Sequence, residues 1–107
     1  MTLGKSAAQA GHAFVQSILS CQQTDPVRER LYHSDGIGTK VCLAAPNLQS
    51  LEKAFEEAKS LGIPTSLITD SGHTSFHGGQ PIVTALGIGP ATRAEVHHIT
   101  KHYKLLE

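Results

Sequence analysis

Residues 39–69 constrain the fold of this chain most, because a helical pattern there separates two short apolar runs. Residues 39–45 (TKVCLAA) form the first run, and residues 65–69 (TSLIT) form the second. Between them, apolar residues recur at helical spacing over residues 47–61, from a capping asparagine to a glycine stop. Short apolar runs suit strands buried on both faces, and strands joined by a helix usually lie parallel. The sequence therefore predicts an α/β fold.

A further helix is predicted over residues 5–20 (KSAAQAGHAFVQSILS), because its residues sort into two faces at about 100° per residue. The residues expected to pack inward share one narrow arc: Ala7, Gly11, Phe14 and Ile18. The residues on the opposite side form what we call the polar ladder: Lys5, Gln9, His12 and Gln16. One helix therefore presents a row of polar groups on a single face.

The remaining segments complete the predicted order of elements. A helix capped at position 24 or 25 runs to about His33, and residues 82–88 (IVTALGI) read as a strand. Gly89 and Pro90 open a last helix, and the tail KLLE can add an edge strand. We expect the strands 65–69 and 82–88 to pair antiparallel, because the loop between them is polar and contains no helical pattern.

These elements predict a three-layer α/β/α sandwich with a small mixed, mostly parallel sheet, in a single domain spanning residues 1–107. A chain of 107 residues and 11.4 kDa allows one compact domain. With 39% apolar residues and a mean hydropathy of −0.13, it reads as a soluble globular chain, and no apolar run approaches the roughly 18 residues of a membrane span.

Charge and cysteine content limit which partners the chain is expected to bind and in which compartment it is expected to work. Nine Lys and Arg residues balance nine Asp and Glu residues, so a polyanionic partner would need a local positive patch. Two cysteines are too few for the disulfide framework of a small secreted domain. The cytoplasm is therefore the expected compartment.

Asp70 is the first candidate for chemistry, because it stands at the carboxyl end of a predicted strand, where ligands gather in α/β sheets. A local turn stabilised by Asp70 and Thr74 is an equally good interpretation from position alone. The opening of the first helix adds free N–H groups and the Lys5 ammonium, which together make an anion-attracting corner.

Two other polar features carry less weight. His98 and His102 are spaced to hold a metal, but two histidines without a third ligand are more typical of a solvated helix face. Cys21 has no evident base beside it, so a cysteine nucleophile is not expected.

Three segments carry a resemblance to a known family: GKSAAQAGHA at 4–13, ITDSGHTSF at 68–76 and LGIGP at 86–90. Together they resemble the signature blocks of the peptidyl-tRNA hydrolase type II family, and the resemblance extends over essentially the whole chain. It implies a mixed-sheet α/β/α fold, commonly a homodimer, that hydrolyses the ester joining a peptide to the 3′ end of tRNA. It implies no metal or organic cofactor.

The resemblance also implies site residues. Lys5 matches the second lysine of the family's Gly-Lys-Gly-Lys start, Gln9 the glutamine of its Ala-Ala-Gln, and His12 the histidine three residues later. Asp70 and Thr74 match the aspartate and threonine of its Thr-Asp-x-Gly-x-Thr loop. The positions Lys5 and Asp70 are those already singled out on physical grounds.

The chain also departs from the family pattern. Leu3 stands where the family has a lysine, and Gly11 stands where it often has a serine. His73 stands at a position that is often basic, and Ser75 stands at one that is often glutamine. Fewer fixed positive charges should weaken phosphate contacts. The strand that usually precedes the lysine-containing loop is absent from this sequence, and its loss would leave backbone groups of neighbouring strands unpaired unless dimerisation or another edge compensates.

Our hypothesis for the reaction follows from what ester hydrolysis needs. Asp70 would take a proton from the attacking water, with Thr74 orienting that water or the carboxylate. Lys5 would stabilise developing negative charge or hold the 3′-terminal phosphate. Gln9 would hydrogen-bond the ester or the water, while the residues expected to contact substrate are His12, Ser71, Gly72 and His73.

Two other functions stay open at this point. The chain could keep the family fold as a binding or interaction module with weak or no catalysis, given its neutral charge and absent lead strand. It could also be a small-molecule or metal-binding domain that uses its histidines.

Overall fold

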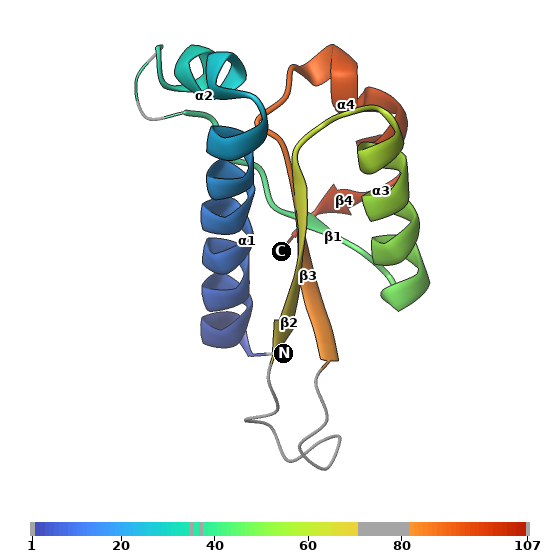
Figure 1. The fold of residues 1–107 in the computed structure, drawn as a ribbon. Helices are drawn as coiled ribbons and strands as arrows, with labels where there is room; N and C mark the ends of the chain where they lie inside the picture. Colours follow the sequence, from blue (N-terminus) through green and yellow to red (C-terminus); the bar gives the residue numbers. More distant parts are fainter. Residues whose placement is uncertain (1, 35, 37, 71–81, 107) are drawn as a thin grey trace.

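The computed structural model describes residues 2–34, 36, 38–70 and 82–106 (Figure 1). In chain order its elements are α1 (Leu3–Thr24), α2 (Pro26–His33), β1 (Leu43–Ala44), α3 (Leu48–Ser60), β2 (Thr65–Asp70), β3 (Ile82–Ile88), α4 (Arg93–Thr100) and β4 (Lys104–Leu105). The predicted order of helices and strands is confirmed, including the edge strand in the tail. No helix in the described ranges is both long and apolar enough to cross a membrane.

Side-chain caps explain where two of the predicted helices begin. Asp25 Oδ1 accepts a hydrogen bond from the Arg28 N–H at 3.1 Å and starts α2. Asn47 Oδ1 accepts one from the Ser50 N–H at 2.9 Å and starts α3. Such caps satisfy first-turn N–H groups that have no partner within the helix. Both helices therefore begin where the sequence predicted.

The β2–β3 pair is the centre of the molecule. The two strands pair antiparallel, as predicted, with Thr65 opposite Ile88 and Asp70 opposite Ile82. A register shift lies between Ile68 and Thr69. Figure 1 shows α1 along one face of this pair and α3 along the other. Asp70 is the last residue of β2, a strand that α1 contacts.

The prediction of a sandwich with a mostly parallel sheet is wrong. The structure contains two separate two-stranded antiparallel sheets, β2–β3 and β1–β4, and no parallel pair among the described strands. The run 39–45 contributes only the two residues of β1, and Leu43 pairs with Leu105 of the tail instead of with β2. The helix α3 thus connects two sheets, so it does not impose the parallel pairing expected from a strand, helix and strand in one sheet.

The buried face of α1 also differs from the prediction. Its buried residues are Ala13, Ser17 and Cys21, whereas Ala7 and Gly11 are exposed. By angular position this buried arc lies about 100° round the helix from the polar ladder, instead of opposite it. The polar ladder therefore lies at the edge of the α1 contact with the hairpin, where its groups can reach both strands and solvent.

Small residues allow α1 to approach β3 closely. A Cβ placed on Gly87 would lie 2.5 Å from the Ala13 carbonyl oxygen and 3.0 Å from Ser17 Oγ. On the opposite face of the hairpin, Ala54 and Ala58 of α3 pack with Ile63 and Ile99 in the core. The hairpin is thus held between helices that contact it through small side chains.

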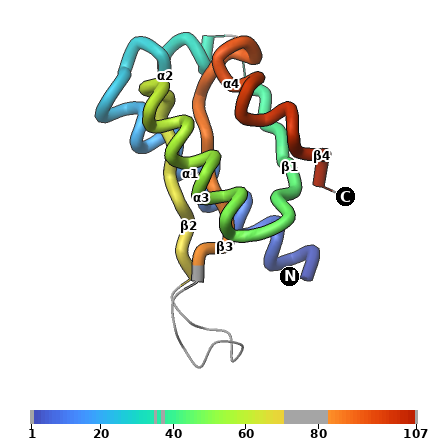
Figure 2. The backbone as a smooth tube through the Cα atoms, turned by 90° about the vertical axis from the view of Figure 1, so that its right-hand side faces the viewer, coloured from blue at the N-terminus to red at the C-terminus, as the bar shows by residue number. Residues whose placement is uncertain are grey.

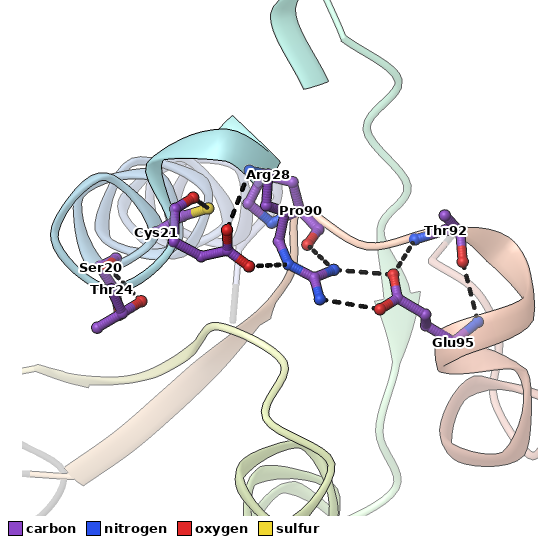
Figure 3. Close-up of polar contacts among 8 residues, drawn as sticks. Ser20, Cys21, Thr24, Arg28, Pro90, Thr92 and Glu95 are labelled. Carbon is purple, nitrogen blue, oxygen red and sulfur yellow. Dashed lines mark hydrogen bonds and ion pairs between the residues drawn. The ribbon is translucent and has the colours of Figure 1, made fainter. Parts of the chain in front are cut away.

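Arg28 links α2 to the start of α4 (Figure 3). Its guanidinium donates to both carboxylate oxygens of Glu95, at 2.8 and 2.9 Å, and to the Pro90 carbonyl at 3.0 Å. Glu95 also accepts from the Thr92 N–H, while the Thr92 hydroxyl accepts from the Glu95 N–H in a capping box. This capping box starts α4 at Arg93, later than the sequence predicted.

The Arg28–Glu95 pair predicts a pH-dependent stability. The hydrogen bonds from Arg28, followed by that from the Thr92 N–H, lower the pKa of Glu95 from 4.5 to about 2. Because the folded-state pKa is the lower one, the pair stabilises the fold above about pH 4.5, and this contribution is lost as the pH falls toward 2. We expect Glu95→Gln to lower the melting temperature near neutral pH, with a difference from wild type that shrinks below pH 4.5.

Thermal unfolding followed by circular dichroism from neutral pH downward measures this difference. Glu52→Gln, at an exposed site on α3, is the control and should match wild type throughout. A constant melting-temperature difference for Glu95→Gln across the whole pH range would contradict the prediction.

The α1–β3 contact predicts opposite effects for two glycine substitutions. Gly87→Ala should lower the free energy of unfolding by about 1–3 kcal/mol, because its methyl group would meet the Ala13 backbone. Gly11→Ala, at an exposed position of α1 with open space around its Cβ, should raise the free energy of unfolding by about 1 kcal/mol through helix propensity. Urea denaturation checks both, and equal effects would show that close packing at Gly87 is unimportant.

Candidate active site

Lys5 and Asp70 form the centre of the site. Lys5 Nζ lies 2.6 Å from Asp70 Oδ2, with the Asp70 side chain only 7% exposed and that of Lys5 29% exposed. A carboxylate this buried is costly unless a cation accompanies it. The first turn of α1 supplies that cation, and its N-terminal N–H groups add partial positive charge nearby. The corner therefore holds a carboxylate and an ammonium in direct contact, in a chain of zero formal charge.

Gln9 is the next member of the polar ladder and contacts β3. The Thr84 hydroxyl donates to Gln9 Oε1 at 2.7 Å, and it also lies 3.4 Å from the Ile68 carbonyl oxygen. Because Thr84 engages the amide oxygen, the NH₂ group of Gln9 is the end suited to donate to a substrate oxygen. Sequence reasoning missed Thr84, although it is the one hydroxyl in the apolar run IVTALGI.

A pocket of about 680 Å³ opens beside Asp70 and Gln9. Asp70 lies at one end of its lining, and β2 forms much of the wall. The other lining residues come from the polar ladder and from α3: Gln9, His12, Gln16 and Phe55. A pocket of this size can hold a small organic group such as an amino acid ester. Three members of the polar ladder, Gln9, His12 and Gln16, thus face a cavity.

The structure brings together four of the predicted site residues. Gln9, His12 and Asp70 line the pocket, and Lys5 pairs with Asp70. The other four predicted site residues lie outside the described residues: Ser71, Gly72, His73 and Thr74.

The less favoured candidates gain no support from the described geometry. Cys21 is fully buried, and its Sγ donates to the Asp25 carbonyl at 3.4 Å. Burial, followed by the charge of Asp25, raises the pKa of the Cys21 thiol, which disfavours the thiolate. His98 and His102 are exposed, and within the part of the chain that the structure describes no three His, Cys, Asp or Glu side chains gather as a metal site.

Comparison with known proteins identifies the family of this chain. The family model described as peptidyl-tRNA hydrolase PTH2 matches residues 1–106. A peptidyl-tRNA hydrolase of Methanococcus vannielii is 37% identical over 106 residues, covering 99% of this chain and 89% of the relative. A peptidyl-tRNA hydrolase of Halobacterium salinarum is 42% identical over 100 residues, covering 94% and 84% respectively. With its whole length matched in this way, the chain belongs to the peptidyl-tRNA hydrolase PTH2 family.

Proposed function

We propose that this protein hydrolyses the ester bond between a peptide, or an N-blocked amino acid, and tRNA. The observation that carries the proposal is the buried Asp70 carboxylate, held 2.6 Å from the Lys5 ammonium at the edge of a pocket. The names of the archaeal relatives support the same substrate. A carboxylate and a cation side by side can serve both proton transfer and charge stabilisation.

In the proposed reaction, Asp70 takes a proton from a water molecule while the water oxygen attacks the ester carbonyl carbon. The carbonyl oxygen becomes an oxyanion, which the Lys5 ammonium stabilises. Collapse of this tetrahedral intermediate breaks the bond to the ribose oxygen, which leaves with the proton held by Asp70. The products are a tRNA with a free terminal hydroxyl and a peptide carboxylic acid, which loses its proton to solvent as a carboxylate, and no cofactor enters the step.

The remaining predicted residues support these steps in the proposal. Gln9 donates its NH₂ group to the substrate carbonyl or to the water, and His12 lines the pocket beside the peptide portion. Thr74 is proposed to orient the attacking water. Ser71, Gly72 and His73 are proposed to contact the substrate next to Asp70.

The setting of the enzyme is also part of the proposal. We place it in the cytoplasm, where its substrate arises during translation, as a single domain over residues 1–107. A homodimer is proposed from the family resemblance and from two exposed apolar side chains one turn apart on α1, Val15 and Leu19. Sedimentation equilibrium should then give twice the chain mass of 11.4 kDa.

Asp70→Asn tests the proposed base. It should lower the rate of release of N-acetylated amino acid from N-acetyl-aminoacyl-tRNA by about 10²–10⁴-fold, because an amide cannot accept the proton. Glu29→Gln, on α2 at the far end of α1, makes the same chemical change away from the pocket and should keep the wild-type rate. Full turnover by a folded Asp70→Asn protein would remove Asp70 from the reaction.

Lys5→Gln tests whether the ammonium serves the reaction or binds phosphate. Because Nζ lies 2.6 Å from Asp70, we expect kcat to fall by about 10²-fold while the salt dependence of kcat/KM stays unchanged. Lys53→Gln, at an exposed site on α3, is the control. A shallower salt slope, by about one, in Lys5→Gln would instead assign Lys5 to a phosphate of the tRNA.

A further inference from the structure

The pocket beside Asp70 lies along one edge of β2. Every residue of this strand lines it, from Thr65 to Asp70. Successive residues of a strand point to opposite faces, so a cavity on one face would be lined by every second residue. The helical lining residues also come from both faces of the hairpin, because three belong to the polar ladder of α1 and Phe55 belongs to α3. A position along the strand edge explains both sets of residues.

This outer edge of β2, the edge away from β3, has no strand partner among the described residues. β2 pairs with β3 alone, and Figure 2 shows β1 and β4 on the far side of β3. The Gly89 N–H donates to the Pro64 carbonyl at 2.7 Å, so Pro64 is a residue whose backbone points toward β3. Because these directions alternate along an antiparallel strand, the N–H and C=O groups of Thr65 and Leu67 point outward. Outward-pointing groups of this kind favour another extended backbone.

The position of Asp70 indicates which chain can fill the pocket. Asp70 is the last residue of β2, so the pocket begins at the proposed reaction centre and extends about 16 Å along the strand to Thr65. In the proposed substrate the ester carbonyl is the C-terminus of the peptide, which continues from there toward its N-terminus. A peptide that extends from Asp70 along β2 therefore runs parallel to the strand, with its N-terminus near Thr65.

The charge of the lining favours the peptide over the tRNA strand as the occupant. Beyond the Lys5–Asp70 pair, the described residues that line the pocket include no Lys or Arg. Lys59 lies 5.0 Å from the centroid of the Phe55 ring, but it does not line the pocket. A nucleic-acid strand brings a phosphate charge with each nucleotide and needs cations along its path. A peptide backbone needs hydrogen-bonding groups, which the outer edge of β2 supplies.

We propose that the outer edge of β2 binds the peptide portion of the substrate as an added parallel strand, an assignment that rests on the proposed hydrolysis. A substrate residue level with Ile68 donates its N–H to the Leu67 carbonyl. A substrate residue level with Ser66 donates to the Thr65 carbonyl and accepts from the Leu67 N–H. These contacts involve only the peptide backbone. They are therefore available to peptides of different sequence, and their number grows with peptide length.

A series of substrates of increasing peptide length tests this assignment. Each substrate carries the same C-terminal alanine on tRNA, preceded by zero to seven further alanines and an N-acetyl group. We expect kcat/KM to rise by at least about tenfold between one residue and five, because each backbone contact adds net hydrogen-bond free energy. The rise should level off at about six residues, since β2 begins at Thr65.

N-methylation of one amide at a time provides matched controls within the five-residue substrate. In a parallel strand, the N–H groups of alternate residues point toward the same neighbour. Methylation of the amides that point toward β2 should lower kcat/KM by about tenfold, whereas methylation of the amides between them should change it by less than about twofold. Equal effects at every position would contradict backbone pairing.

Two glutamine substitutions on α1 test the far end of the pocket. Gln16 lies about 16 Å along the helix from Lys5, which is also the span of β2 from Asp70 to Thr65. Gln16→Trp should reduce the ratio of kcat/KM for the five-residue substrate to that for the one-residue substrate by about fivefold. Gln23→Trp, at an exposed site of α1 outside the pocket, should keep the wild-type ratio. Because the ratio is taken within one protein, a change in folding or in general activity cancels.

Hydrogen exchange separates this inference from the proposed hydrolysis. The probe is N-acetylated pentaalanine with a C-terminal amide, which contains no ester. We expect it to slow exchange of the Leu67 amide in the wild-type protein and in Asp70→Asn, because the peptide accepts from that N–H. The Ser66 amide, which points toward β3, should exchange at the same rate with and without the peptide.

Three results would overturn the assignment. A kcat/KM that does not depend on peptide length would mean that the pocket holds only the residue at the ester. An unchanged exchange rate of the Leu67 amide at saturating peptide would mean that the edge does not accept a strand. Protection of Leu67 by tRNA without an amino acid, and not by the peptide, would assign the edge to the nucleic acid. Protection of Leu67 by the peptide without cleavage of any substrate would instead overturn the proposed hydrolysis and support the peptide site.

Discussion

The close contact of α1 with β3 is the constraint on which the site depends. At Gly87 the helix lies against the strand with no room for a side chain, and Ala13 and Ser17 are the helix residues at that contact. The close approach of α1 to β3 brings the polar ladder near the hairpin, so that Lys5 reaches Asp70 at the end of β2. Moving the helix outward by the width of a methyl group would lengthen an ion pair whose strength falls with distance.

The sequence predicted the local features well and the long-range pairing poorly. Caps at Asp25 and Asn47, and the polar ladder that includes Lys5, follow from short-range patterns that the fold preserves. The partner of the run 39–45 depends on which distant backbone approaches it, and nothing in that run specifies the tail residues that pair with it. The burial of Ser17 instead of Gly11 likewise depends on where the hairpin contacts α1, which helical periodicity alone does not determine.

The candidate site illustrates how a chain with no net charge can still present a charged site. Asp70 is buried with its own cation, so the pair adds nothing to the total charge yet holds opposite charges 2.6 Å apart beside a pocket. The same principle appears at Arg28 and Glu95, where the pair joins two helices and neither residue lines the 680 Å³ pocket. Geometry relative to a cavity, and not the presence of an ion pair, therefore separates the reactive candidate from the structural one.

The pairing of Leu43 with Leu105 has a consequence for how the molecule assembles. The contact joins residues on either side of α3, the hairpin and α4, so most of the chain must be in place before it can close. Contacts between residues far apart in sequence carry a larger loop-closure entropy and form late in folding. Lys5 and Asp70 are separated by a similar length of chain, so the ion pair of the site carries a comparable closure entropy. During synthesis, β1 waits for Leu105, which is added after every residue of α3, the hairpin and α4.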